Sequence, residues 1–185
     1  MIKPGLTREI ALPAGVSASL RHTTVIIRGS EGEAQRDINH PHVKVSVEKD
    51  NEKNKIVLST VRGTRREKTL LGSLAAHLKN LVKGVQEQQV YKLKVCSGHF
   101  PMTVTVSGTE FVVKNFLGES VPRTVDVVPG VTIKVNDKEI LVTSPDKEKA
   151  GLMTERIEQL CRITNRDVRI FMDGIWITEK AGKAV

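Results

Sequence analysis

The sequence has 185 residues, of which 39% are hydrophobic and 27% are charged, a balance typical of a globular protein with a buried core. No apolar run approaches the ~20 residues that a membrane-spanning helix needs. The start, MIKPGLTREIALPAG, lacks the apolar stretch of a secretory signal, so we expect a cytoplasmic protein.

The charge balance of the chain is basic. The 29 lysines and arginines exceed the 21 aspartates and glutamates, and the net charge is +8. Residues 1–100 hold 17 basic and 9 acidic side chains, whereas residues 101–185 hold 12 of each. Such an excess most often indicates a polyanionic partner, of which nucleic acid is the commonest. The alternative is a soluble protein that is merely basic.

The first half of the chain predicts several strands followed by one helix. Short strands are expected over 17–22 and 25–29, and valines at 43, 45 and 47 alternate with polar residues, as in a strand with one buried face. The sequence DNEKN at 50–54 predicts a turn into a strand over 56–60. Apolar residues then recur at helical spacing over 64–83, and Gly84 is the expected stop. Residues 91–95 alternate as one more strand.

The second half repeats this order. Strands are expected where Val104 and Val106 alternate and over 111–117, 123–128, 131–135 and 140–144, and a helix follows with Pro145 and Asp146 at its start. The last strands, over 168–171 and 175–178, are expected to flank a turn at Asp173-Gly174.

The repeated order indicates an internal duplication. The segment IRGSEGEAQRDI, which begins at Ile27, matches VSGTEFVVKNFLGE, with Gly29 on Gly108, and the same offset places Leu74 on Met153. The fold class is therefore expected to be α+β, with two tandem, duplicated modules, each a mostly antiparallel β-sheet with one packed α-helix. We expect the joint near the sequence SGHFP at 97–101. The predicted domains are an N-terminal module, 1–97, and a C-terminal module, 98–185.

Metal and disulfide chemistry find little support in the sequence. Cys96 and Cys161 occupy positions typical of a strand and a helix core, which predicts reduced, buried thiols. The pairs His40/His42 and Cys96/His99 do not make a four-ligand set, so no metal and no cofactor is expected.

Catalytic motifs are also missing from the sequence. It has no phosphate-binding loop, nucleophile elbow, zinc-protease helix or dinucleotide fingerprint. An enzyme would have to use Asp126 or Asp173 as a general acid or base, and a turn or strand-end role for both is favoured. We therefore expect no enzyme.

The densest basic segment, VRGTRREKTLLGSLAAHLKNLVKG, contains a single acidic residue, Glu67. Its candidates for polyanion binding are Arg62, Arg65, Arg66 and Lys68. They precede the predicted helix or occupy its first turn, where backbone amides also favour a phosphate. The alternative is a solvated helix face. Aromatic residues make up only 3% of the chain, so we expect contacts with RNA backbone and shape, not a base-stacking sheet.

The segment NRDVRIFMDGIWITEK, at 165–180, resembles the C-terminal signature of a ribosomal protein family. This family is the sixth universal protein of the large subunit, called number nine in eukaryotes. The segments TVIIRGSEG, RDINHPHV, LVKGV, HFPMTV, KNFLGE and VPGV support the resemblance in order along nearly the whole chain. Together they are similar to the eukaryotic or archaeal branch.

The resemblance implies a structural constituent of the large ribosomal subunit with two similar α+β domains. It implies binding to large-subunit ribosomal RNA near the sarcin–ricin loop and the stalk base, beside neighbouring proteins and where translation GTPases dock. The second domain is then the main RNA contact. The RNA-binding residues that it implies are Lys114, Asn115, Arg123, Arg166, Arg169, Lys180 and Lys183.

The charge distribution and the family resemblance place the main RNA contact in different halves of the chain. The basic excess favours the first half, whereas the family resemblance favours the second. The cluster from Arg62 to Lys68 is kept as a second surface. In the first domain, Glu31 stands in a glycine turn that is usually basic or proline-containing in the family. The alternative function is a free-standing RNA-binding chaperone or translational regulator.

Overall fold

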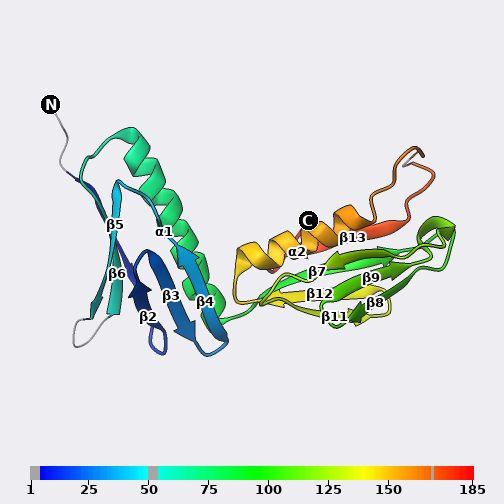
Figure 1. Ribbon diagram of the computed structural model, residues 1–185, viewed down its shortest axis with the longest axis horizontal. Coiled ribbons are helices and arrows are strands. Elements are labelled where there is room, and N and C mark those ends of the chain that lie inside the picture. The colour runs from blue at the N-terminus through cyan, green and yellow to red at the C-terminus, as the bar shows by residue number, and fades with distance from the viewer. Residues whose placement is uncertain (1–4, 50–53, 168) are drawn as a thin grey trace. The chain divides into compact units, whose positions relative to one another are not determined.

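The computed structural model describes residues 5–49, 54–167 and 169–185, and it divides into two compact units, Met1–Gln88 and Gln89–Val185 (Figure 1). Each unit has its own hydrophobic core. Every strand pair in the described ranges is antiparallel. The α+β fold class is confirmed. No helix within these ranges is long and apolar enough to cross a membrane.

The first unit consists of two three-stranded sheets and one long helix. The sheets have the orders β1-β6-β5 and β2-β3-β4, and α1 packs against β3, β4, β1 and β6. The elements are β1 (Thr7–Ala11), β2 (Ser17–Arg21), β3 (Thr24–Gly29), β4 (Gly32–Asp37), β5 (Val43–Lys49), β6 (Asn54–Thr60) and α1 (Arg65–Gln86).

The packing of α1 follows from its sequence. Leu71, Ala75, Leu78, Val82 and Val85 recur every three or four residues, so they form one stripe that is buried against the sheets. The expected stop, Gly84, lies inside α1 and is buried. The helix continues because burial of this stripe outweighs the roughly 1 kcal/mol that a glycine costs within a helix.

The second unit has a similar three-stranded sheet, β10-β9-β8, and a larger sheet, β11-β12-β7-β13-β14. Helix α2 packs against β7, β12, β13 and β10. The elements are β7 (Gln89–Cys96), β8 (Thr103–Ser107), β9 (Glu110–Lys114), the short 3-10 helix η1 (Phe116–Gly118), β10 (Arg123–Asp126), β11 (Thr132–Asn136), β12 (Glu139–Ser144), α2 (Lys147–Leu160), β13 (Gly174–Lys180) and β14 (Lys183–Ala184).

The strand orders match between the units, as a duplication requires. The sheet β1-β6-β5 corresponds to β7-β12-β11, and β2-β3-β4 corresponds to β8-β9-β10. In both units a helix follows the sixth strand. Among the described residues of the first unit, the pairing of β7 with β13 has no counterpart, because the chain leaves that unit directly after α1.

The structure corrects the register of the repeat. Gly29 ends β3, the third strand of its unit, whereas Gly108 follows β8, the second strand of its unit. The true counterpart of Gly108 (φ 61°) is His22 (φ 55°), since each begins a two-residue turn with a positive φ. The Gly-Ser/Thr-Glu match therefore aligns the turn after β3 with the turn after β8, and these two turns are not equivalent. A short motif of turn residues fits many turns.

The joint between the units also differs from the expected one. Strand β7 lies between β12 and β13 in the second unit, and its residues Tyr91, Leu93 and Val95 are buried in the second core. The division therefore falls after Gln88 and not at residue 97. Alternation marks a strand but not the neighbours with which it pairs, so the sequence could not assign β7 to a unit.

Two further expectations concern turns. The expected strand over 168–171 is wrong for its described part, because residues 169–170 form a turn; Val168 lies outside the described residues. Asp173 and Gly174 do not form a hairpin turn, since Gly174 begins β13 and Asp173 is buried. Of the expected turn at 50–54, residues 50–53 lie outside the described ranges.

Candidate nucleic-acid interface

The turn that follows β9 carries the first two expected contacts. Lys114 ends β9 and is exposed. Asn115 adopts the left-handed conformation, with φ of 58°, and its side-chain amide donates to the Pro101 carbonyl at 2.9 Å. Asparagine tolerates this conformation better than most residues. The turn thus presents Lys114 to solvent, while the Asn115 side chain holds the turn against Pro101.

The Arg123 guanidinium donates hydrogen bonds within the protein from all three of its nitrogens. It donates to both carboxylate oxygens of Glu119 at 2.8 and 2.6 Å, and its third nitrogen donates to the Leu160 carbonyl at 2.7 Å. The guanidinium also lies 4.4 Å from the ring centre of Phe116. Arg123 therefore joins η1 and its flanking turn to the last residue of α2, where a cation is favourable to the helix dipole.

Electrostatics support this arrangement of Arg123 and Glu119. Hydrogen bonds from Arg123 lower the pKa of Glu119, and the nearby charge of Arg166 acts in the same direction. The Glu119 carboxylate is therefore ionised at neutral pH, and the charge of Arg166 is near enough to favour that form. Such charge-assisted, two-pronged pairs are stronger than neutral hydrogen bonds.

Asp173 anchors the loop that follows β7. Its carboxylate is 4% exposed and accepts hydrogen bonds from the Gly98 amide, the His99 amide at 3.0 Å and the His99 ring Nδ1. Burial raises the pKa of Asp173, but the hydrogen bonds from His99 and Gly98 outweigh it, so the pKa lies below the usual 3.8. The buried charge is thus matched by donors from a segment more than seventy residues earlier.

Phe171 packs on this anchored loop, and Arg166 packs on Phe171. The Phe171 ring lies 4.8 Å from the His99 ring and 4.9 Å from the Arg166 guanidinium, measured to the ring centres. Arg169 pairs with Asp167, at 2.9 Å, and its side chain is 90% exposed. Arg166 is therefore placed by an aromatic contact, and Arg169 projects into solvent with a carboxylate beside it.

Lys180 and Lys183 lie apart from this group. They flank a two-residue turn and are directly opposite each other in the β13–β14 ladder, and both are exposed. Like charges that face each other across two strands are destabilising unless an anion compensates them. Gly174 is paired with Cys96 at one end of β13 and Lys180 with Tyr91 at the other, so β13 separates the lysines from Asp173 by about 20 Å.

The first-unit cluster surrounds the start of α1. Thr64 caps the helix: its hydroxyl accepts from the Glu67 amide at 3.3 Å, and the Glu67 carboxylate accepts from the Thr64 amide at 2.9 Å. The capping box therefore satisfies the amides of Thr64 and Glu67 and places a carboxylate of the protein itself at the helix end. The side chains of the four cations are exposed: Arg62, Arg65, Arg66 and Lys68.

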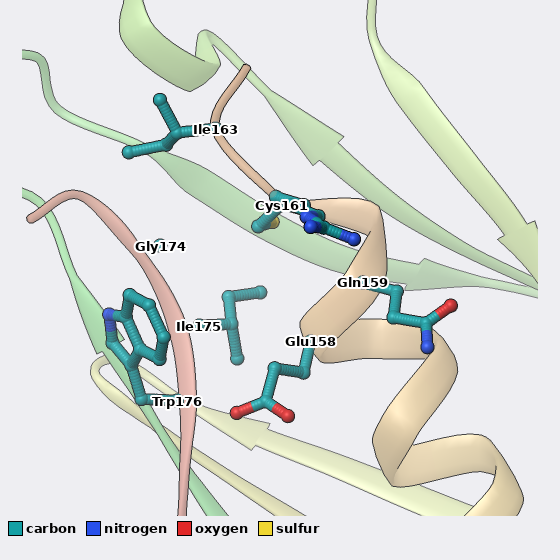
Figure 2. A pocket seen from close by; sticks show the side chains of 8 residues that line it. Glu158, Gln159, Cys161, Ile163, Gly174, Ile175 and Trp176 are labelled. Atoms are coloured by element: carbon teal, nitrogen blue, oxygen red, sulfur yellow. The ribbon is translucent and has the colours of Figure 1, made fainter. Parts of the chain in front are cut away.

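A cavity of about 350 Å³ lies between the end of α2 and the start of β13 (Figure 2). Figure 2 shows Glu158, Gln159 and Cys161 on the helix side and Ile175 and Trp176 on the strand side. Burial raises the pKa of the Cys161 thiol to about 12, so it is no nucleophile at neutral pH. Glu158 accepts from the Ile177 amide at 3.3 Å. Of this lining, Cys161 thus belongs to the second core and Glu158 holds β13.

Neither carboxylate considered for catalysis is arranged for it. Asp126 is exposed on β10, and Asp173 is occupied by three donors. Among the described residues, no group of three or more histidines, cysteines or acidic side chains is placed to hold a metal ion. Both cysteines are free, with Cys161 buried and Cys96 partly so.

The structure brings three distant segments together at one end of the second unit. Asn115 contacts Pro101, His99 and Arg166 flank Phe171, and Arg166 acts on Glu119. Sequence reasoning missed the anchoring role of Asp173, because Asp-Gly is a common hairpin signal. It also missed the pairing of Arg123, for which the spacing of Glu119 and Arg123 at i and i+4 was the available sign.

Comparison with known proteins finds close relatives. The family model "Ribosomal protein L6" matches twice, at residues 12–88 and 100–174. The "Large ribosomal subunit protein uL6" of Nanoarchaeum equitans is 42% identical over 190 residues, covering 98% of this chain and 97% of its own. Its namesakes in Methanococcus vannielii and Ignicoccus hospitalis are 36% and 37% identical, each over at least 91% of both chains.

Proposed function

Because this chain belongs to the ribosomal protein L6 family, we propose that it is a structural constituent of the large ribosomal subunit and binds large-subunit ribosomal RNA. The observation that carries the proposal is the match of the family model to both repeats, with archaeal relatives aligned along nearly the whole chain. The family is structural and not enzymatic, so the chain is not an enzyme.

We further propose that the main RNA contact lies at the end of the second unit where three segments meet. Lys114, Arg166 and Arg169 are its cations, since all three are exposed. Lys180 and Lys183 form a separate contact at the far end of β13, because two facing lysines are best compensated by phosphate. Each phosphate that one of these cations neutralises would release counterions from the RNA on binding.

Arg123 and Asn115 act in this proposal as positioning residues and not as contacts. Their donors are used within the protein, Arg123 on Glu119 and Leu160, and Asn115 on Pro101. They hold the turn that carries Lys114. A rigid turn matters because an RNA of fixed shape is recognised by cations held at fixed places.

The place of this contact within the subunit is also a proposal. Resemblance to the family supports a site near the sarcin–ricin loop and the stalk base, beside the region where translation GTPases dock. The chain would then reside on cytoplasmic ribosomes and support factor docking by holding RNA helices in place.

Sedimentation tests the proposed function. A tagged copy expressed in cells should co-migrate with the large subunit through a high-salt gradient, and it should be released when the subunit is unfolded by removal of magnesium. A free-standing RNA chaperone or translational regulator would instead stay near the top of the gradient in high salt. That second outcome would exclude a permanent place in the subunit.

A further inference from the structure

A groove of about 850 Å³ opens beside the start of α1 in the first unit. Three segments line it: the loop between β4 and β5, the link between β6 and α1, and the first turns of α1. The polar residues that line it include His40, His42, Arg62, Arg66, Thr69 and Ser73. The groove is therefore built by residues that are far apart in the sequence.

The charge of this groove is strongly positive. Arg62 and Arg66 line it, and Arg65 and Lys68 are exposed on the same stretch of chain. Within the described residues, none of these four cations forms an ion pair. The acidic residue in the lining, Glu67, is 8% exposed, and its carboxylate is committed to the capping box.

This arrangement contrasts with the cations of the second unit. There Arg123 and Arg169 each pair with a carboxylate of the protein, Glu119 and Asp167. Exposed arginines without such partners keep all their donors for a ligand, and the planar guanidinium suits the two oxygens of a phosphate. Because the capping box places the Glu67 carboxylate at the helix end, a ligand would be held mainly by the cationic side chains.

We propose that this groove binds the phosphodiester backbone of RNA, as a second anchoring surface on the first unit. The inference rests on the proposed function, since it takes ribosomal RNA as the polyanion that the groove binds. Phosphate contacts of this kind depend on charge and shape and not on base sequence. The groove offers guanidinium, imidazole and hydroxyl groups, all of which can donate hydrogen bonds to the oxygens of a phosphodiester backbone.

The test uses the full chain and a transcript of large-subunit ribosomal RNA. The variant Arg62→Gln/Arg66→Gln removes two charges from the groove. Its matched control, Lys79→Gln/Lys83→Gln, removes two exposed charges from the same helix, with Lys79 about 20 Å along the axis from Arg66. A third variant, Arg62→Lys/Arg66→Lys, keeps the charge. Circular dichroism establishes that all three are folded.

The groove variant should bind the transcript about tenfold more weakly, and the slope of log affinity against log salt should fall by about 2, one unit for each lost phosphate contact. The lysine variant should keep the wild-type slope, and the control should keep most of the affinity. Equal losses in the groove variant and the control would overturn the proposal, because only net charge would then matter.

Two further outcomes separate this inference from the proposed function. If Lys114→Gln/Arg166→Gln weakens binding and the groove variant does not, the groove proposal fails and the proposed function stands. If the wild-type chain does not bind the transcript at all, both fail. Polyglutamate serves as a competitor: if the groove variant loses polyglutamate binding but keeps RNA binding, the occupant is an acidic protein segment and the RNA proposal is overturned.

Discussion

Arg123 donates to both carboxylate oxygens of Glu119, at 2.8 and 2.6 Å, and it also donates to the Leu160 carbonyl at 2.7 Å. One guanidinium thus holds the turn after β9 against the end of α2. All three nitrogens of this guanidinium donate hydrogen bonds inside the protein. In the function that we propose, Arg123 therefore acts by holding its neighbours in position and not by binding phosphate itself.

Replacement of Arg123 by glutamine should destabilise the second unit. The change removes hydrogen bonds between charged groups and leaves the Leu160 carbonyl without its donor, which should cost about 1–3 kcal/mol of unfolding free energy. Urea unfolding of the whole chain, followed by circular dichroism, measures the loss. The matched control is Arg169→Gln, because Arg169 also pairs with a nearby carboxylate but has a side chain that is 90% exposed. That control should leave the unfolding free energy almost unchanged, and a larger loss in it than in Arg123→Gln would contradict the structural role.

Asp173 should make the second unit sensitive to acid. Its pKa is lowered in the folded protein, so the stabilisation is complete above the unfolded pKa near 3.8 and is lost as the pH falls below that value. Asp173→Asn should lower the urea midpoint at neutral pH, because the buried group then has no charge to match its three donors. The difference between the wild type and this variant should shrink as the pH is lowered from 5 towards 3. A difference that stays constant across this range would show that ionisation of Asp173 does not stabilise the fold.

The position of β7 predicts which fragment can fold. Residues 89–185 should fold alone, since they contain β7 between β12 and β13. Residues 98–185 should not, because they lack the buried Tyr91, Leu93 and Val95, each worth roughly 1.5–3 kcal/mol of burial. Cooperative thermal unfolding and resistance to protease distinguish the two fragments. A cooperative transition in 98–185 would support the joint at 97–101 and would contradict the central role of β7.

Charge reversal compares the two surfaces directly. We expect the triple Lys114→Glu/Arg166→Glu/Arg169→Glu to lose more affinity for large-subunit RNA than Arg65→Glu/Arg66→Glu/Lys68→Glu. The second-unit cations lie together on three segments that are held by internal contacts, whereas the first-unit surface is the secondary one in our proposal. Filter binding at several salt concentrations gives both affinity and slope. If the first-unit triple abolishes binding and the other has no effect, the count of basic residues predicts the RNA-binding surface better than the family resemblance does.

Most of the secondary structure was predictable from local pattern. Alternation at Val43, Val45 and Val47 predicts β5, and the helical stripe that includes Leu71 and Leu78 predicts α1. The order of elements also indicates the duplication and the α+β class, because side-chain periodicity reports directly which face of an element is buried. The family resemblance also predicts the function, since the motifs of the family occur in order along the chain.

The tertiary structure alone decided how the elements pair and which polar groups meet. Nothing local in QVYKLKVC states that β7 pairs with β12 and β13, because a strand pattern is the same whichever neighbours cover it. Nothing near Asp173 in the sequence reveals that Gly98 and His99 donate to it. The same holds for Arg123, whose bond to Leu160 depends on the packing of α2. The sequence by itself therefore determined the elements and the charge of the surface, whereas long-range packing decided which cations are bound within the protein and which remain exposed to solvent.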